Sequence, residues 1–115
     1  MDWLNNPYAQ LTDWYQILGG EKLQRGIVPS DIDGIIESGG YFLALEVKHP
    51  GEETSPGQAR MLWALSKIPR FTVIKLELNV DGGVATAVRY GDDSTISIGP
   101  GLLWTFIRKW IDSHS

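Results

Sequence analysis

The sequence predicts a domain of the α/β class, in which helices cover a mixed β-sheet. The first observation is the Gly39-Gly40 pair, which lies between two β-rich runs, Ile32–Glu37 and Tyr41–Lys48, as in a β-hairpin. The second is a helix-start pattern at Ser55-Pro56, with further strand-like runs behind it. We therefore expect the order α-β-β-α-β-β-β-α, with the helices packed on a mixed sheet.

Two of the expected helices lie near the ends of the chain. Residues 8–18 have the spacing of an amphipathic helix, and Gly19-Gly20 ends it. The last helix follows Gly99-Pro100-Gly101. The apolar stripes of these helices consist of Leu11, Trp14, Tyr15 and Leu18 in the first, and Leu103, Phe106, Ile107, Trp110 and Ile111 in the last.

The middle helix has a clear start and a clear end. Ser55 suits the N-cap position and Pro56 the first helical position. Gln58 completes a capping box, which is one explanation for its presence. Pro69 ends the helix. Its buried stripe is expected to consist of Met61, Leu62, Leu65 and Ile68.

The strand Tyr41–Lys48 is expected to lie inside the sheet, because both of its faces are apolar near the turn. Only its far end, at Glu46 and Lys48, is charged. Later runs with strand character complete the sheet, and a short extra strand is expected near residues 26–28. The later strands are Phe71–Leu78, Val84–Tyr90 and Thr95–Ile98.

Length and composition limit the possible functions. The 115 residues predict one domain, residues 1–115, with 43% hydrophobic and 21% charged residues, as in an ordinary globular protein. The absence of cysteine excludes disulfides, zinc–cysteine sites and cysteine nucleophiles. With no signal peptide and no apolar run of ~20 residues, we expect a cytoplasmic protein without a membrane partner. The formal charge of −4 disfavours tight, nonspecific binding to DNA.

The expected hairpin brings acidic residues together. If Gly39-Gly40 is the loop, counting outward places Asp33 opposite Glu46 and Asp31 opposite Lys48. Directly opposed side chains have Cβ atoms only ~5 Å apart, and like charges placed so are destabilising. Two carboxylates held together need a cation or a proton, so the hairpin predicts a metal site.

The order of Asp, hairpin, Glu-x-Lys and a helix carrying Gln resembles the PD-(D/E)XK nuclease superfamily. The stretch from Lys48 to Gln58 is especially similar to small stand-alone VRR-type and Holliday junction resolvase-like nucleases of phages, and the resemblance covers residues 26–78. It implies a restriction-endonuclease-like αβββαβ core, here with extra C-terminal strands and a helix. It also implies a Mg²⁺- or Mn²⁺-dependent deoxyribonuclease that hydrolyses phosphodiester bonds in DNA.

The resemblance also implies roles for individual residues. Asp33, Glu46 and the backbone carbonyl of Val47 would bind the metal ion. Lys48 would orient or activate the attacking water, and Gln58 would belong to the catalytic set. Carboxylate and carbonyl oxygens are the ligands that Mg²⁺ prefers.

This sequence departs from the family pattern at one point. The family places Pro and Asp next to each other, whereas Pro29 is followed here by Ser30-Asp31-Ile32-Asp33. Either Asp31 or Asp33 could therefore be the main ligand; the register favours Asp33. Asp31 could bind a second ion, and Glu21 is a further candidate, since some family members use a Glu near the first helix.

Two functional interpretations follow. The first is a DNA endonuclease that nicks DNA or selects a structure such as a junction or flap, with a homodimer suited to four-way DNA. The tryptophans are expected mostly in the core, but Trp104 and Trp110 on the last helix could also form the dimer face. The second is an adaptor that keeps the nuclease fold with weak catalysis and binds nucleic acid within a phage recombination or packaging complex.

Overall fold

The computed structural model describes residues 14–17, 19–20 and 32–115. The chain divides into two units, residues 1–31 and 32–115, and each is described by itself. In the first unit, helix α1 spans Trp14–Ile17 and a turn follows at Gly19-Gly20, where the sequence predicted the helix to end. The rest of that expected helix and the expected strand near residues 26–28 lie outside the described residues. The prediction of one domain over the whole chain therefore stays a prediction.

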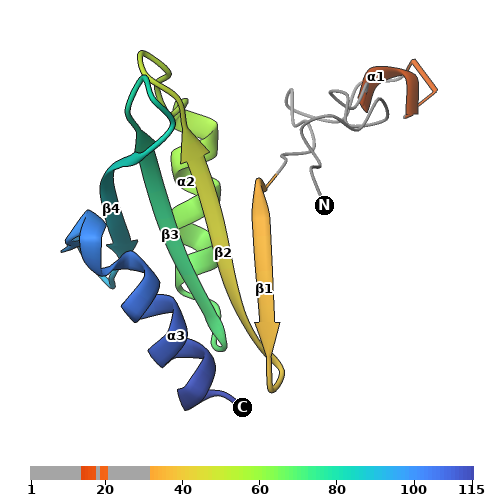
Figure 1. Ribbon diagram of the computed structural model, residues 1–115. Helices are drawn as coiled ribbons and strands as arrows, with labels where there is room; N and C mark the ends of the chain where they lie inside the picture. Colours follow the sequence, from red (N-terminus) through yellow and green to blue (C-terminus); the bar gives the residue numbers. More distant parts are fainter. Residues whose placement is uncertain (1–13, 18, 21–31) are drawn as a thin grey trace. The chain divides into compact units, whose positions relative to one another are not determined.

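The second unit contains a five-stranded mixed sheet with the strand order β1-β2-β3-β4-β5 (Figure 1). Strands β2 and β3 are parallel, and the other neighbours are antiparallel. The α/β class with a mixed sheet is thus confirmed. The strands are β1 (Gly34–Ser38), β2 (Tyr41–Lys48), β3 (Phe71–Leu78), β4 (Val84–Tyr90) and β5 (Thr95–Ile98).

The helices of the second unit cover opposite faces of this sheet (Figure 1). Helix α2 (Pro56–Ser66) makes the crossover that a parallel pair requires, from β2 to β3. A 3₁₀ turn, η3 (Pro100–Leu102), leads into α3 (Leu103–Ser113) on the other face. The β2-α2-β3 order matches part of the core that the nuclease resemblance implies.

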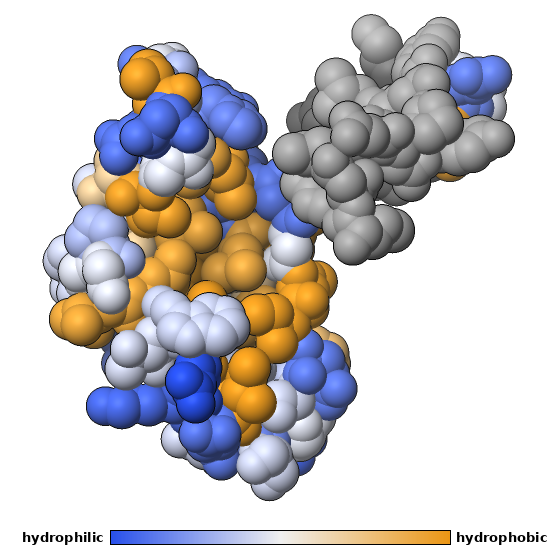
Figure 2. Space-filling model, in the orientation of Figure 1, coloured by the Kyte–Doolittle hydropathy of each residue, from blue (hydrophilic) through white to orange (hydrophobic). Residues whose placement is uncertain are grey.

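Each face of the sheet has its own core, as expected for a strand β2 that is apolar on both sides. Figure 2 shows the α3 side, where apolar surface gathers over the middle of the unit and hydrophilic surface lies at its two ends. The buried residues under α3 are Leu43, Ile74, Leu76, Ala87, Ile98 and Trp110. Those under α2 are Ala44, Leu62, Val73 and Tyr90.

Three sequence predictions need correction. The first strand begins at Gly34 rather than Ile32, because Asp33 lies in a bend and bonds through its side chain. Ile68 is 48% exposed, since α2 already ends at Ser66. Trp110 is only 7% exposed and its indole N–H donates to Thr72 Oγ1 at 3.2 Å, so it belongs to the core and offers no dimer face; Trp104 is 69% exposed.

The hairpin turn packs against the end of α3. Gly39 and Gly40 have φ angles of 59° and 83°, as the two central residues of a type I′ turn require. The hydroxyl of Ser38 donates to the carbonyl oxygen of His114 at 3.3 Å, and the His114 ring lies against the Tyr41 ring, tilted by 33°, with ring centroids 4.2 Å apart. A Cβ added at Gly39 would overlap that same carbonyl oxygen.

We expect Gly39→Ala to lower the free energy of unfolding by about 2–4 kcal/mol, because backbone strain and overlap with His114 combine. Gly51→Ala is the matched control, since Gly51 also has a positive φ (81°) but an added methyl group there would have nothing within 4 Å. We expect it to cost about 1 kcal/mol. Urea denaturation of both variants measures the difference, and equal losses would contradict the packing of α3 on the turn.

Among the described residues, no helix has the length and apolar character needed to cross a membrane.

Candidate functional site

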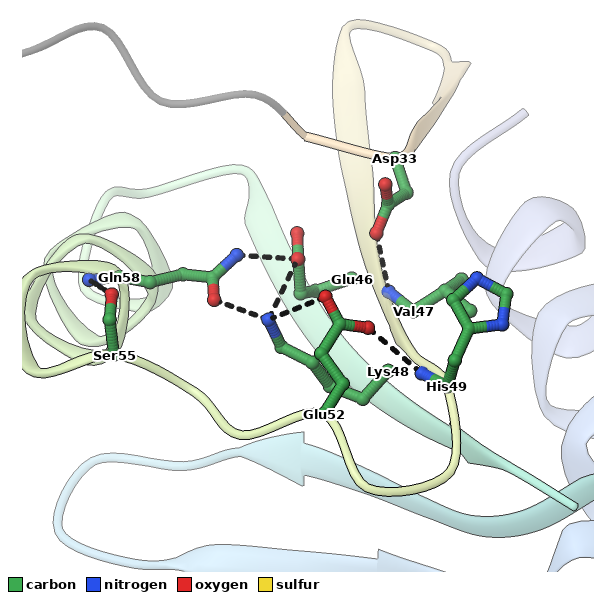
Figure 3. Close-up of polar contacts among 8 residues, drawn as sticks. All are labelled: Asp33, Glu46, Val47, Lys48, His49, Glu52, Ser55 and Gln58. Carbon is green, nitrogen blue, oxygen red and sulfur yellow. Dashed lines mark hydrogen bonds and ion pairs between the residues drawn. The ribbon is translucent and has the colours of Figure 1, made fainter. Parts of the chain in front are cut away.

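The hairpin places Asp33 beside the charged end of β2. The observed pairing runs from Ser38 opposite Tyr41 to Gly34 opposite Leu45, as the sequence predicted. One step further, Asp33 lies next to Glu46, and its Oδ2 accepts a hydrogen bond from the backbone N–H of Val47 at 2.7 Å (Figure 3). The Asp33 side chain therefore replaces the next backbone hydrogen bond between β1 and β2.

Glu46 is a buried carboxylate with one unsatisfied oxygen. It is 4% exposed, and its Oε1 accepts a hydrogen bond from Gln58 Nε2. Its Oε2 is buried and has no hydrogen-bond partner among the described residues. Burial raises the pKa of Glu46, and the charge of Asp33 raises this pKa further, whereas Lys48 and Gln58 act in the opposite direction. A buried carboxyl of this kind needs a proton or a cation.

Lys48 is held by three acceptors at the same place (Figure 3). It is 5% exposed, and its Nζ donates to Gln58 Oε1 at 2.5 Å. The same nitrogen lies 3.6 Å from Glu46 Oε1 and 3.9 Å from Glu52 Oε2. The ammonium is thus fixed and its charge is balanced by carboxylates.

Glu52 is a part of the site that the sequence reasoning missed. It lies four residues after Lys48, in the loop that follows β2, and its Oε1 accepts a hydrogen bond from the N–H of His49 at 3.0 Å. This bond, with smaller effects of Lys48 and His49, lowers the pKa of Glu52. The Pro50-Gly51 pair was the available signal, because a turn there folds the loop back toward Lys48.

Gln58 lies in the site and does not complete a capping box. Ser55 is the N-cap, and its hydroxyl accepts a hydrogen bond from the Gln58 backbone N–H at 3.1 Å, so that half of the prediction is confirmed. The side chain, however, bridges Lys48 and Glu46 instead of returning to the cap. The cap explanation of this side chain is therefore wrong, because the first turn of α2 lies over the charged end of β2.

We expect Gln58→Leu to lower the free energy of unfolding by about 2 kcal/mol, because it leaves two buried charged groups short of a hydrogen bond each. Ser55→Ala removes only the cap and should cost about 1 kcal/mol. Chemical denaturation compares them. A Gln58→Leu variant as stable as the wild type would contradict the bridging role.

Three further metal ligands were predicted: the Val47 carbonyl, Asp31 and Glu21. The N–H of Val47 points to Asp33, and since a strand residue directs its N–H and C=O to the same side, the Val47 carbonyl also faces that side. Asp31 and Glu21 lie outside the described residues. Within the described ranges, no group of three or more His, Asp or Glu side chains is arranged to hold a metal ion, so Asp33 and Glu46 form a pair only.

Two neighbours of the site come from other strands. Lys75 on β3 is the register partner of Glu46, and Tyr90 on β4 is buried against the Trp63 ring. Burial raises the pKa of Tyr90, and the charge of Glu46 adds to this. Their positions depend on the β2–β3 and β3–β4 registers, which no local signal comparable to Gly39-Gly40 marks in the sequence.

Comparison of this chain with protein-family models, curated proteins and solved structures found no match. The nuclease resemblance rests on Asp33, Glu46, Lys48 and Gln58 themselves.

Proposed function

We propose that this protein is a metal-dependent deoxyribonuclease that cleaves DNA phosphodiester bonds internally. The observation that carries the proposal is the buried Glu46 carboxylate, which lies beside Asp33 and has an oxygen without a hydrogen-bond partner among the described residues. A purely structural pair of carboxylates would be destabilising at this place. A divalent cation between them would remove the repulsion.

The donor atoms at the site fit Mg²⁺ or Mn²⁺. Asp33, Glu46 and the carbonyl of Val47 offer hard oxygen ligands, and Mg²⁺ usually completes its shell with water and substrate phosphate. Asp31 and Glu21 are additional candidates on sequence grounds. When bound, the ion would polarise the scissile phosphate and lower the pKa of its water.

The protein's own residues would then position and neutralise charge. Gln58 fixes the orientation of both Glu46 and Lys48 through its amide. The Lys48 ammonium would stabilise negative charge on the phosphate oxygens as it develops. The low exposure of both side chains strengthens these interactions, because water screens them little.

The finer parts of the proposal concern the substrate and the assembly. A unit of this size covers a short length of duplex, so a homodimer would suit a junction, a flap or a nick, with two active sites related by a twofold axis. A phage-encoded enzyme acting in the cytoplasm of the infected cell fits this role. Trp104, which is exposed on α3, stays available for such contacts.

An adaptor function is the second candidate, and the formal charge of −4 favours it. An adaptor would bind nucleic acid or another protein with the same fold and would have no use for a divalent cation at Asp33 and Glu46. Calorimetric titration separates the two functions: the nuclease should bind Mn²⁺ in a site that is lost in Asp33→Asn.

The direct test is incubation of the protein with labelled junction, flap, nicked and linear DNA in the presence of Mg²⁺ or Mn²⁺. We expect cleavage of at least one substrate, and chelation of the metal should stop it. The absence of cleavage of all four would overturn the proposal.

A further inference from the structure

The proposed site has an excess of negative charge. Asp33, Glu46 and Glu52 contribute three carboxylates. Among the described residues, one cation, Lys48, forms ion pairs here, and its charge is already balanced by Glu46 and Glu52. The net charge of these four groups is −2, so one divalent ion would only bring it to zero and would leave no net attraction for a DNA phosphodiester. A second cation near the site would supply that attraction.

Lys75 is placed to supply it. In the parallel β2–β3 pair, Lys75 is aligned with Glu46, and Val73, two residues earlier on β3, lies in the core under α2. Because residues i and i+2 of a strand share a face, the Lys75 side chain leaves the sheet on the same face as Glu46. Strand β3 is the middle strand of five, so its backbone is a rigid support.

The Lys75 ammonium is uncommitted within the described part of the chain. No hydrogen bond or ion pair involves it there, whereas Lys48 is bound by Gln58 and two carboxylates. The next charged residue on the same face of β3, Glu77, accepts a hydrogen bond from Thr86 at 3.1 Å. Lys75 is only partly buried, so its head group remains accessible to a ligand.

We infer that Lys75 binds a phosphate of the DNA next to the bond that is cleaved, and so determines substrate affinity more than the rate of the chemical step. This inference rests on the proposed nuclease function and adds to it a residue that the nuclease resemblance did not supply. One lost phosphate contact should weaken binding at every sequence and reduce its salt dependence.

The test uses Lys75→Met, which keeps the apolar stem, Lys75→Arg, which keeps the charge, and Lys109→Met on the opposite face of the sheet as the matched control. Binding of a fluorescent four-way junction is measured with Ca²⁺ in place of Mg²⁺ at several salt concentrations. We expect Lys75→Met to bind about five- to tenfold more weakly at low salt, with the slope of log K against log salt reduced by about 0.9. Cleavage with Mg²⁺ should show a raised KM with kcat within about twofold of the wild type, and Lys75→Arg should restore the KM.

The outcomes separate this inference from the function on which it rests. If the wild type cleaves DNA and Lys75→Met behaves like Lys109→Met, the role of Lys75 is overturned and the nuclease stands. A fall in kcat with an unchanged KM would also overturn it. If the wild type neither binds nor cleaves the junction or the other DNA substrates, the proposed function itself fails.

Discussion

Glu46→Gln should reduce metal-dependent DNA cleavage at least ~100-fold and, at neutral pH, should make the metal-free protein more stable. The activity is lost because an amide cannot replace the carboxylate as a metal ligand. The stability is gained because the amide can donate a hydrogen bond toward Asp33, where the wild type has two repelling carboxylates. A variant that cleaves DNA less but is more stable than the wild type would show that the activity is not lost through unfolding.

The pH dependence of this gain has a defined sign. The pKa of Glu46 is raised in the folded protein above its ordinary value of 4.5 by burial and by Asp33. The folded state therefore binds more protons than the unfolded state above pH 4.5, and the contribution of Glu46 to stability falls as the pH rises through the raised pKa. The advantage of Glu46→Gln over the wild type should grow between pH 4.5 and neutrality.

Thermal unfolding in EDTA at a series of pH values measures this difference, since 1 kcal/mol corresponds to roughly 4 °C or more in Tm for a domain of this size. Glu53→Gln, at an exposed position in the neighbouring loop, is the matched control for the change of charge. Millimolar Mn²⁺ should stabilise the wild type and leave Glu46→Gln unchanged. If Glu46→Gln cleaves DNA normally, or if its stability falls with rising pH as that of the wild type does, Glu46 is not the metal-binding carboxylate with a raised pKa.

Lys48→Met should lower cleavage by about 10²–10³-fold and the free energy of unfolding by about 3 kcal/mol. The methionine keeps the buried stem but removes the ammonium that donates to Gln58 and faces Glu46 and Glu52. Glu46 then remains in a buried position with no cation within ion-pair distance among the described residues. The exposed Lys67, at the other end of α2, provides the control Lys67→Met, which should change stability by no more than ~0.5 kcal/mol.

A double-mutant cycle identifies the cause of this destabilisation. In Glu46→Gln/Lys48→Met, no uncompensated charge is left at these two positions, so a large part of the loss in Lys48→Met should be recovered. Urea denaturation of the four proteins gives the coupling free energy, and cleavage is measured well below the lowest Tm. If the effects of the two single substitutions on the free energy of unfolding were additive in the double variant, Lys48 and Glu46 would not be coupled, and the proposed balance of charges would be wrong.

The hairpin was predictable because its signals are local. Gly39-Gly40 fixes both the turn and the register, and the register brings Asp33 to Glu46 without any knowledge of the rest of the sheet. The same holds for the cap at Ser55, which depends only on the residues that follow it. The order of strands and helices in residues 32–115 followed from periodicity and turn residues.

The parts that failed depend on contacts between elements. The cap explanation of the Gln58 side chain failed because its distance to Lys48, which depends on the docking of α2 on β2, is not visible in the sequence. The nuclease resemblance, in contrast, had placed Gln58 in the catalytic set. Trp110 was expected in the apolar stripe of the last helix, and only the alternative of a dimer face failed, since its bond to Thr72 joins positions 38 residues apart. The place of Lys75 beside Glu46 likewise requires the parallel register of two strands that are separated by a helix.

The polar network around Lys48 has a consequence for the order of folding. Its three principal hydrogen bonds, Val47 to Asp33, Lys48 to Gln58 and Gln58 to Glu46, close chain segments of only 14, 10 and 12 residues. Contacts of such short sequence separation form rapidly and at low entropic cost, compared with the pairing of distant strands. We expect the hairpin, the loop and the start of α2 to assemble as one early unit, before β2 pairs with the distant strand β3 and before α3 docks on the sheet.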